Sequence, residues 1–141
     1  TTLVVSRIVF ALPKTSLNRS GDAARALLQH YDLDASQMLV VVDDINLPLG
    51  RIRIRADGSD GGHNGLESII DQLGTQQFPR LRLGIGPLPE GADQVDYVLG
   101  EFEQNVLTIV KKMIATASEA VMFCLEHDLE EAMSRYNQNP A

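Results

Sequence analysis

A chain of 141 residues, of which 44% are hydrophobic and 22% charged, can bury one ordinary core but not two, so we predict one domain over residues 1–141. The formal net charge of −7 argues against a general nucleic-acid binder, because such proteins gain most of their nonspecific affinity by neutralising phosphates; an RNA partner would need basic groups concentrated at one place. No apolar run approaches the roughly 20 residues of a membrane span, and the single cysteine, Cys124, rules out an internal disulfide, so we predict a cytoplasmic protein without a membrane partner.

Apolar residues open the chain, over residues 1–13. Arg7 interrupts them and no basic lead precedes them, which makes a signal peptide a poor interpretation, and we predict a buried strand instead. Residues 18–22 then offer several N-cap side chains, and the apolar positions that follow fall mostly on one helical face. We therefore predict a helix over residues 20–31.

Residues 38–42 form an unbroken apolar run, which is typical of a strand covered by helices on both faces in a sheet with parallel pairs. The run ends abruptly at Asp43 and Asp44, and residues 47–50 have the composition of a turn. Because open α/β sheets bind ligands at the carboxyl ends of their strands, we expect the two carboxylates to lie at a ligand-binding edge.

Residues 51–55 alternate strictly, which predicts a strand at the rim of the sheet with isoleucines on one face and three arginines on the other. Residues 56–65 contain four glycines and are expected to form a loop. A short helix is predicted over residues 66–73, ended by Gly74, and the alternation of residues 80–85 predicts a further strand with Arg80 and Arg82 on one side.

The C-terminal part of the chain is expected to be helical. After a loop marked by Pro87, Pro89 and Gly91, apolar positions recur at helical spacing from Glu103, and a shorter helix is predicted from Asp128. Strands that alternate with helices predict the α/β class, here a single domain with a mixed twisted sheet flanked by helices.

The sequence Gly-Gly-His-Asn-Gly, at residues 61–65, is the densest chemical signal in the chain. Glycines such as Gly62 let the backbone approach a ligand closely, and the N-terminus of a following helix favours anionic or carbonyl groups. The same pattern also fits a tight turn into a helix with a solvated histidine. The three histidines and one cysteine show no metal-ligand spacing, so neither a metal nor a cofactor is expected.

Five ordered blocks together resemble a known family. They lie at residues 14–21, 40–50, 58–66, 80–86 and 96–100 and read KTSLNRSG, VVVDDINLPLG, GSDGGHNGL, RLRLGIG and DYVLG. From about Ile8 to Tyr136 the chain is similar to the bacterial-type peptidyl-tRNA hydrolases. The resemblance implies an enzyme that uses a histidine-activated water, without a metal or a covalent intermediate, to cleave the ester between a peptide and the 3′ ribose of tRNA. We also expect a monomer, although the sequence leaves self-association open.

The resemblance also implies a role for individual residues. Asp43 matches the carboxylate that orients the general-base histidine. Asn18 and Asn64 match carboxamides that hold the peptide and the water or the terminal nucleotide, and His63 matches a second, assisting histidine near the tRNA 3′ end. The basic residues that match those contacting the tRNA backbone are Arg53, Arg55 and Arg82.

The chain also departs from the family pattern. The family's Gly-x-Gly-Asn-Pro-Gly turn and its Thr-Arg-His-Asn block, which holds the base, have no counterpart in the sequence, so we expect an N-terminally truncated chain of low activity. Ser16 and Leu17 replace the usual Phe-Met pair. The alternative is a catalytically silent tRNA- or peptide-binding relative that has lost the base; an unrelated α/β hydrolase is disfavoured because no Gly-x-Ser-x-Gly is present.

Each assigned residue also has a simpler explanation. Asp43 could only cap a turn, and Asn18 could only cap a helix. The arginine face of residues 51–55 could serve solubility on an edge strand. His30 and His127 belong to no motif and are expected at the surface or partly buried on helices.

Overall fold

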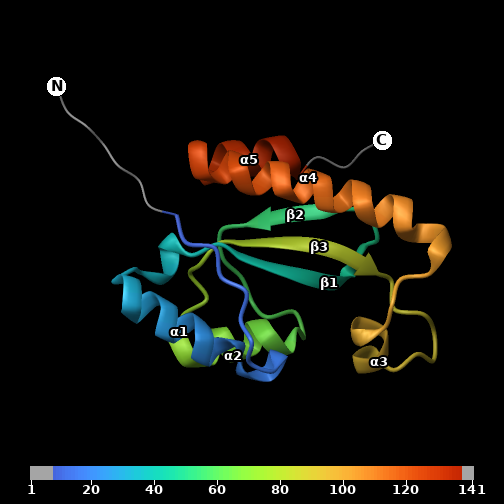
Figure 1. The fold of residues 1–141 in the computed structure, drawn as a ribbon, viewed down its shortest axis with the longest axis horizontal. Helices are drawn as coiled ribbons and strands as arrows, with labels where there is room; N and C mark the ends of the chain where they lie inside the picture. The colour runs from blue at the N-terminus through green and yellow to red at the C-terminus, as the bar shows by residue number, and fades with distance from the viewer. Residues whose placement is uncertain (1–7, 138–141) are drawn as a thin grey trace.

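A computed structural model describes residues 8–137 of the chain (Figure 1). Within them the sheet has three strands, β1 (Val40–Pro48), β2 (Ile52–Arg55) and β3 (Arg80–Gly86), in the order β1-β3-β2. The central strand β3 is parallel to β1 and antiparallel to β2, so the sheet is mixed, as predicted. Helices cover it on two sides in Figure 1, α4 and α5 on one and α1 and α2 on the other.

Four of the helices follow the predicted pattern closely. They are α1 (Ser20–Tyr31), α2 (Asn64–Leu73), α4 (Leu107–Glu126) and α5 (Leu129–Tyr136). The helix α3 (Gln94–Leu99) was not predicted, because six residues are too few to show a helical period. The one local signal for it is Asp93, whose side chain accepts a hydrogen bond from the Asp96 amide as an N-cap.

Three expectations about the strands were wrong. Residues 8–13 form no regular structure and are exposed, with Phe10 73% and Leu12 92% accessible, because no strand within the described residues pairs with them; the rest of that predicted strand, residues 1–7, lies outside the described residues. The strand β1 does not end at its two aspartates but continues to Pro48. Among the described residues it is also an edge strand, and Val41 is 51% exposed instead of covered on both faces.

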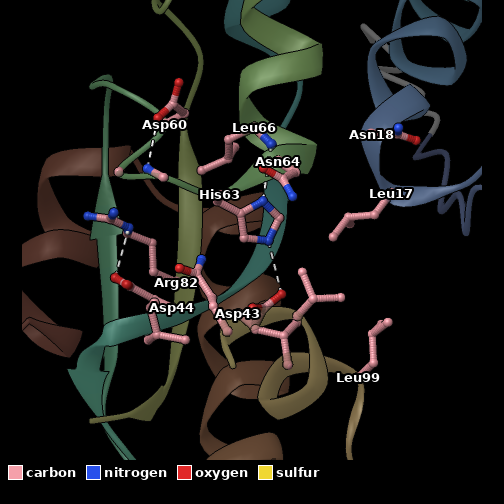
Figure 2. A pocket seen from close by; sticks show the side chains of 16 residues that line it. Leu17, Asn18, Asp43, Asp44, Asp60, His63, Asn64, Leu66, Arg82 and Leu99 are labelled. Carbon is pink, nitrogen blue, oxygen red and sulfur yellow. Dashed lines mark hydrogen bonds and ion pairs between the residues drawn. The ribbon is translucent and has the colours of Figure 1, made fainter. Parts of the chain in front are cut away.

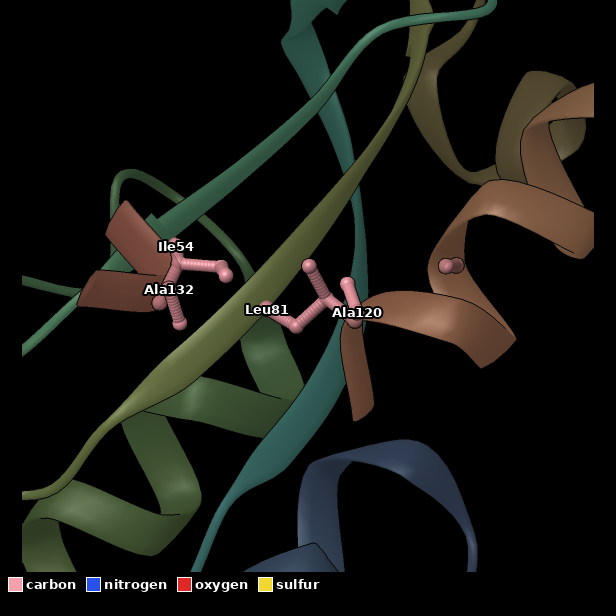
Figure 3. Close-up of a cluster of buried hydrophobic side chains, with 5 residues drawn as sticks. Ile54, Leu81, Ala120 and Ala132 are labelled. Atoms are coloured by element: carbon pink, nitrogen blue, oxygen red, sulfur yellow. The ribbon is translucent and has the colours of Figure 1, made fainter. Parts of the chain in front are cut away.

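The core is divided between the two faces of the sheet. On the side of α4 and α5, small residues let the helices approach the strands closely, and Figure 3 shows Ala120 beside Leu81 and Ala132 beside Ile54. On the side of α1 and α2, the buried residues are Ala24, Leu66, Ile69 and Phe78.

Asn137 closes the outer edge of β2. Its side-chain Oδ1 accepts the Ile54 N–H at 2.7 Å, and its Nδ2 donates to the Ile54 carbonyl at 2.9 Å. The carboxamide thus replaces one residue of a neighbouring strand, which satisfies both backbone groups of the fully buried Ile54.

The glycines of β3 are required by the path of β1. The register of β1 against β3 shifts between Asp44 and Pro48, and the chain there passes directly over β3. A Cβ at Gly84 would lie 2.1 Å from the Pro48 carbonyl oxygen, and one at Gly86 would lie 1.9 Å from that of Ile45. The Gly-Ile-Gly part of the motif at residues 80–86 therefore marks a close backbone approach.

We predict that Gly86→Ala lowers the free energy of unfolding by about 3 kcal/mol or more, because the clash is with backbone and cannot be relieved by a rotamer change. Urea denaturation followed by circular dichroism measures it. Gly100→Ala is the milder comparison, since its φ of −73° suits alanine and its added Cβ would lie 3.0 Å from the Asp96 carbonyl oxygen, against 1.9 Å for the nearest backbone oxygen at Gly86. A decrease below about 1 kcal/mol for Gly86→Ala would contradict the packing described.

Candidate functional site

A pocket lies where β1 leaves β3, between the N-terminus of α2, the 3-10 helix η1 (Leu17–Arg19) and α3 (Figure 2). It brings together Asp43, Asn18, His63 and Asn64, four residues that the sequence indicated from three separate blocks. Gly62 and Arg82 also line it, whereas Arg53 and Arg55 do not. Its lining is Leu17, Asn18, Asp43, Asp44, Ile45, Asp60, Gly61, Gly62, His63, Asn64, Leu66, Arg82, Gln94, Val95, Val98 and Leu99.

A carboxylate–imidazole pair stands at the centre of the pocket. His63 Nε2 lies 3.0 Å from Asp43 Oδ1, with the side chains 12% and 31% exposed (Figure 2). The hydrogen bond from His63 holds the pKa of Asp43 below its ordinary value, although partial burial acts in the opposite direction; the charge of the imidazole adds to the lowering.

The hydrogen bonds of His63 fix its tautomer. His63 is the N-cap of α2, and its Nδ1 accepts the Leu66 N–H at 3.1 Å. Since Nδ1 must be unprotonated to accept, the proton of the neutral ring is on Nε2 and is donated to Asp43. Neither ring nitrogen of neutral His63 is then free to accept a proton from a water, so this arrangement suits a positioning histidine better than a general base.

The two asparagines reach the pocket from helix beginnings. Asn64 is the first residue of α2, and Asn18 lies in η1, where its Oδ1 accepts the Ser16 hydroxyl at 2.9 Å. The N-cap of α1 is Arg19, without a side-chain cap, so Asn18 does not cap that helix. Asn18 lies just before α1, so its position depends on how closely α1 packs against α2. The start of α1 is in close contact with α2, because a Cβ at Gly21 would lie only 2.1 Å from the Ser68 carbonyl oxygen.

One wall of the pocket is apolar; Leu17 and Leu99 belong to two of the sequence blocks, but the wall itself was not predicted. Leu17, Val95 and Leu99 are 43%, 54% and 75% exposed at or near the pocket opening. The latter two belong to α3, which Tyr97 fastens to the sheet by donating its hydroxyl proton to the Ile85 carbonyl. Exposed apolar side chains beside polar groups are typical of a ligand site, so the N-cap signal of α3 could have pointed to this wall.

The predicted arginines share one face of the sheet but differ in exposure. Arg53 is paired with Arg82, and Arg55 with Arg80, in the antiparallel register of β2 and β3. Arg55 is exposed and Arg53 partly buried. Arg82 is 21% exposed, with its Nε 3.2 Å from Asp44 Oδ2. Arg55 is therefore more open to a large anionic ligand than Arg82.

Other features of the described residues lie outside the pocket. His30 is exposed on α1, and His127, also exposed, stacks on Phe123 with ring centroids 4.0 Å apart. Cys124 is partly buried against the core, and burial raises the pKa of its thiol. Across residues 8–137 there is no group of three or more His, Cys, Asp or Glu side chains placed to hold a metal, and no helix is long and apolar enough to cross a membrane.

The fold and the pocket define a class, namely a mixed α/β protein with a carboxylate–imidazole pair and two carboxamides at the end of its sheet. The family model for peptidyl-tRNA hydrolase matches residues 2–141. A peptidyl-tRNA hydrolase from Synechocystis is 50% identical over 125 residues, which are 89% of this chain and 64% of the relative. One from a Thermotoga strain is 45% identical over 135 residues, 96% of this chain and 73% of the relative.

Solved structures agree with this match. The crystal structure of peptidyl-tRNA hydrolase from Acinetobacter baumannii superposes with a TM-score of 0.81 at 30% identity, covering 89% of this chain and 63% of the other. The chain belongs to the peptidyl-tRNA hydrolase family. It spans less than two thirds of the length of the Synechocystis and Acinetobacter proteins.

We predict that His63→Ala raises the pKa of Asp43 toward its ordinary value, because the largest cause of the lowering is removed. Titration of the Asp43 carboxyl carbon by NMR measures it, with His127→Ala as the control. A lowered pKa in the folded state stabilises the fold above the unfolded value of about 3.9, and this contribution disappears as the pH falls through the folded pKa. His63→Ala should therefore weaken the acid dependence of stability below about pH 4; an unchanged Asp43 titration would contradict the assignment.

Proposed function

We propose that this protein hydrolyses the ester bond between a peptide and the 3′ ribose of tRNA, releasing peptide and tRNA for reuse in translation. The observation that carries the proposal is the 3.0 Å contact between His63 Nε2 and Asp43 Oδ1, in a pocket flanked by Asn18 and Asn64. Membership of the peptidyl-tRNA hydrolase family supports the same reaction. No observation favours a silent binding relative over an enzyme.

In the proposed reaction a water attacks the ester carbonyl while an imidazole takes its proton. The C–O bond to the ribose then breaks, and the same proton is passed to the departing 3′ oxygen. Asp43 orients the imidazole and supports its charged form, as a carboxylate does for a general-base histidine. Oδ1 of Asp43 accepts the hydrogen bond from His63 Nε2, so Oδ2 is the oxygen that would accept an N–H from the base.

The remaining pocket residues would hold the substrate. Both asparagine carboxamides can donate to and accept from a peptide backbone, and the exposed Leu17 and Leu99 can cover its side chains. His63 would keep Asp43 and the N-terminus of α2 in place. Since its two nitrogens are both engaged, we assign it to positioning and not to proton transfer.

We also propose where and with what the protein acts. Its substrate would be peptidyl-tRNA, engaged at the single-stranded 3′ end in the pocket and along the acceptor stem by Arg53, Arg55 and Arg82. We infer action in the cytoplasm, where translation takes place, and as a monomer.

We predict that Asp43→Asn lowers kcat/KM for release of tRNA from peptidyl-tRNA by about 10²-fold or more, since a general base loses its orienting partner. His63→Ala should lower the rate less, because both ring nitrogens of His63 are engaged and it positions Asp43 instead of taking the proton from water. Electrophoretic separation of free and peptidyl-tRNA at several pH values gives both results.

The matched control is Asp71→Asn, which removes the same charge from an exposed position on α2. If His63→Ala abolishes turnover together with the acidic limb, His63 is the base. If no hydrolysis depends on Asp43 while peptidyl-tRNA still binds, the protein is a binding relative and the proposal is wrong.

We predict that RNA affinity depends on the arginines of β2 despite the acidic total. Arg53→Ala with Arg55→Ala should flatten the plot of log affinity against log salt by about 0.7 to 0.9 for each phosphate that the protein no longer neutralises. Fluorescence anisotropy with a tRNA acceptor stem measures the slope. Lys111→Ala with Lys112→Ala, on exposed positions of α4, removes the same charge as a control. Equal slopes for the two double variants would show that the arginines form only a solvated face.

A further inference from the structure

Asp44 is a buried acid beside the pocket. Its side chain is 9% exposed, whereas the neighbouring Asp43 is 31% exposed, and the two project in opposite directions from β1 (Figure 2). A carboxylate with so little water around it must be paired to remain charged. Asp44 has two partners, the Asn46 N–H on Oδ1 at 2.8 Å and Arg82 Nε near Oδ2 at 3.2 Å.

The first partner connects Asp44 to the irregular end of β1. The hydrogen bond to Asn46 lies at the start of the stretch in which β1 shifts register against β3, and so it holds the backbone where the regular ladder is interrupted. The Asn46 side chain in turn reaches the Gly61 carbonyl, with its Nδ2 3.4 Å away.

The second partner connects Asp44 to the same glycine. Arg82 lies against Gly61 so closely that a Cβ there would be 2.9 Å from Nη2, and Gly61 has a φ of +58°. Gly61 is therefore contacted by both partners of Asp44. From this loop the chain continues into His63, whose N–H donates to the Asp60 carbonyl at 2.9 Å.

We propose that Asp44 is a positioning residue of the site: through Arg82 and Asn46 it sets the glycine loop, residues 58–62, and thereby holds His63 against Asp43. The inference rests on the proposed function of this pocket and adds to it a residue whose partners are Asn46 and Arg82 and not the imidazole. The simpler explanation is that Asp44 only neutralises Arg82. The two explanations differ in what happens to Asp43 when Asp44 loses its charge.

The test compares Asp44→Asn with Asp71→Asn in the 141-residue chain by NMR. Charged groups lining the pocket are Asp43, Asp44, Asp60, His63 and Arg82. Neutralising Asp44 alone lowers the pKa of Asp43, because a like charge is removed, whereas moving His63 away from Asp43 raises it. If Asp44 positions His63, the pKa of Asp43 rises in Asp44→Asn and is unchanged in Asp71→Asn.

Amide hydrogen exchange gives a second readout in the same samples. The Leu66 amide donates to His63 Nδ1, so it reports the position of the ring, and the Gly74 amide at the far end of α2 reports the helix itself. We expect exchange at Leu66 to accelerate at least about tenfold in Asp44→Asn, with Gly74 unchanged. Arg82→Gln and the double variant should show the same acceleration and no more, because the two residues act through one contact.

A lowered or unchanged pKa of Asp43 in Asp44→Asn, together with unchanged exchange at Leu66, would overturn the proposal. Additive effects of Asp44→Asn and Arg82→Gln on the exchange at Leu66 would show that Asp44 does not act through Arg82. If Asp44→Asn does not fold, Arg82→Gln and Asn46→Ala decide the question by the exchange at Leu66: acceleration in both supports the proposal and no change in either rejects it. These readouts use the free protein, so a failure of the hydrolysis assay leaves their outcome intact.

Discussion

The pocket depends on the way in which β1 leaves its pairing with β3 after Asp44. Up to that residue the two strands run in regular parallel register; beyond it the backbone of β1 passes over two glycines of β3 where no Cβ could be accommodated. At the point of departure two adjacent carboxylates project in opposite directions, Asp43 to His63 and Asp44 to Arg82. The close approach of the two backbones therefore fixes the geometry of the pocket.

A buried guanidinium secures the loop that faces this strand end. Arg80 is 1% exposed; among the described residues it meets backbone carbonyls and no carboxylate, donating to those of Ser59 at 3.2 Å, Gln76 at 2.8 Å and Phe78 at 3.2 Å. It also stacks on the Phe78 ring at 4.2 Å. A delocalised cation tolerates this environment better than a lysine would, and its hydrogen bonds offset part of the cost of burial. The glycine loop is thus held by Arg80 at Ser59 and contacted by Arg82 at Gly61.

Much of the fold was predictable, because long periodic segments show their secondary structure in their spacing. The bounds of α1 and the αL cap of α2 at Gly74 followed from spacing and capping alone. The meeting of Asp43 with the His-Asn loop was predictable only through strand-end reasoning and motif order. The direct contact between Asp43 and His63 was not, because a sequence does not show which imidazole a carboxylate will meet. Nor could periodicity predict the apolar wall of α3, since six residues carry no period and the Asp93 N-cap is its local signal.

The roles of Asp43 and His63 follow from their protonation and their hydrogen bonds. Asp43 has a lowered pKa and is ionised at neutral pH, which makes it a weak base but a good partner for a charged imidazole. His63 has a suitable ring but uses one nitrogen on the Leu66 amide and the other on Asp43. In the proposed reaction, proton transfer from water would therefore need an imidazole whose nitrogen is not already engaged, and Oδ2 of Asp43 would orient such a ring. The residues of this pocket are thus organised to support a base more than to serve as one.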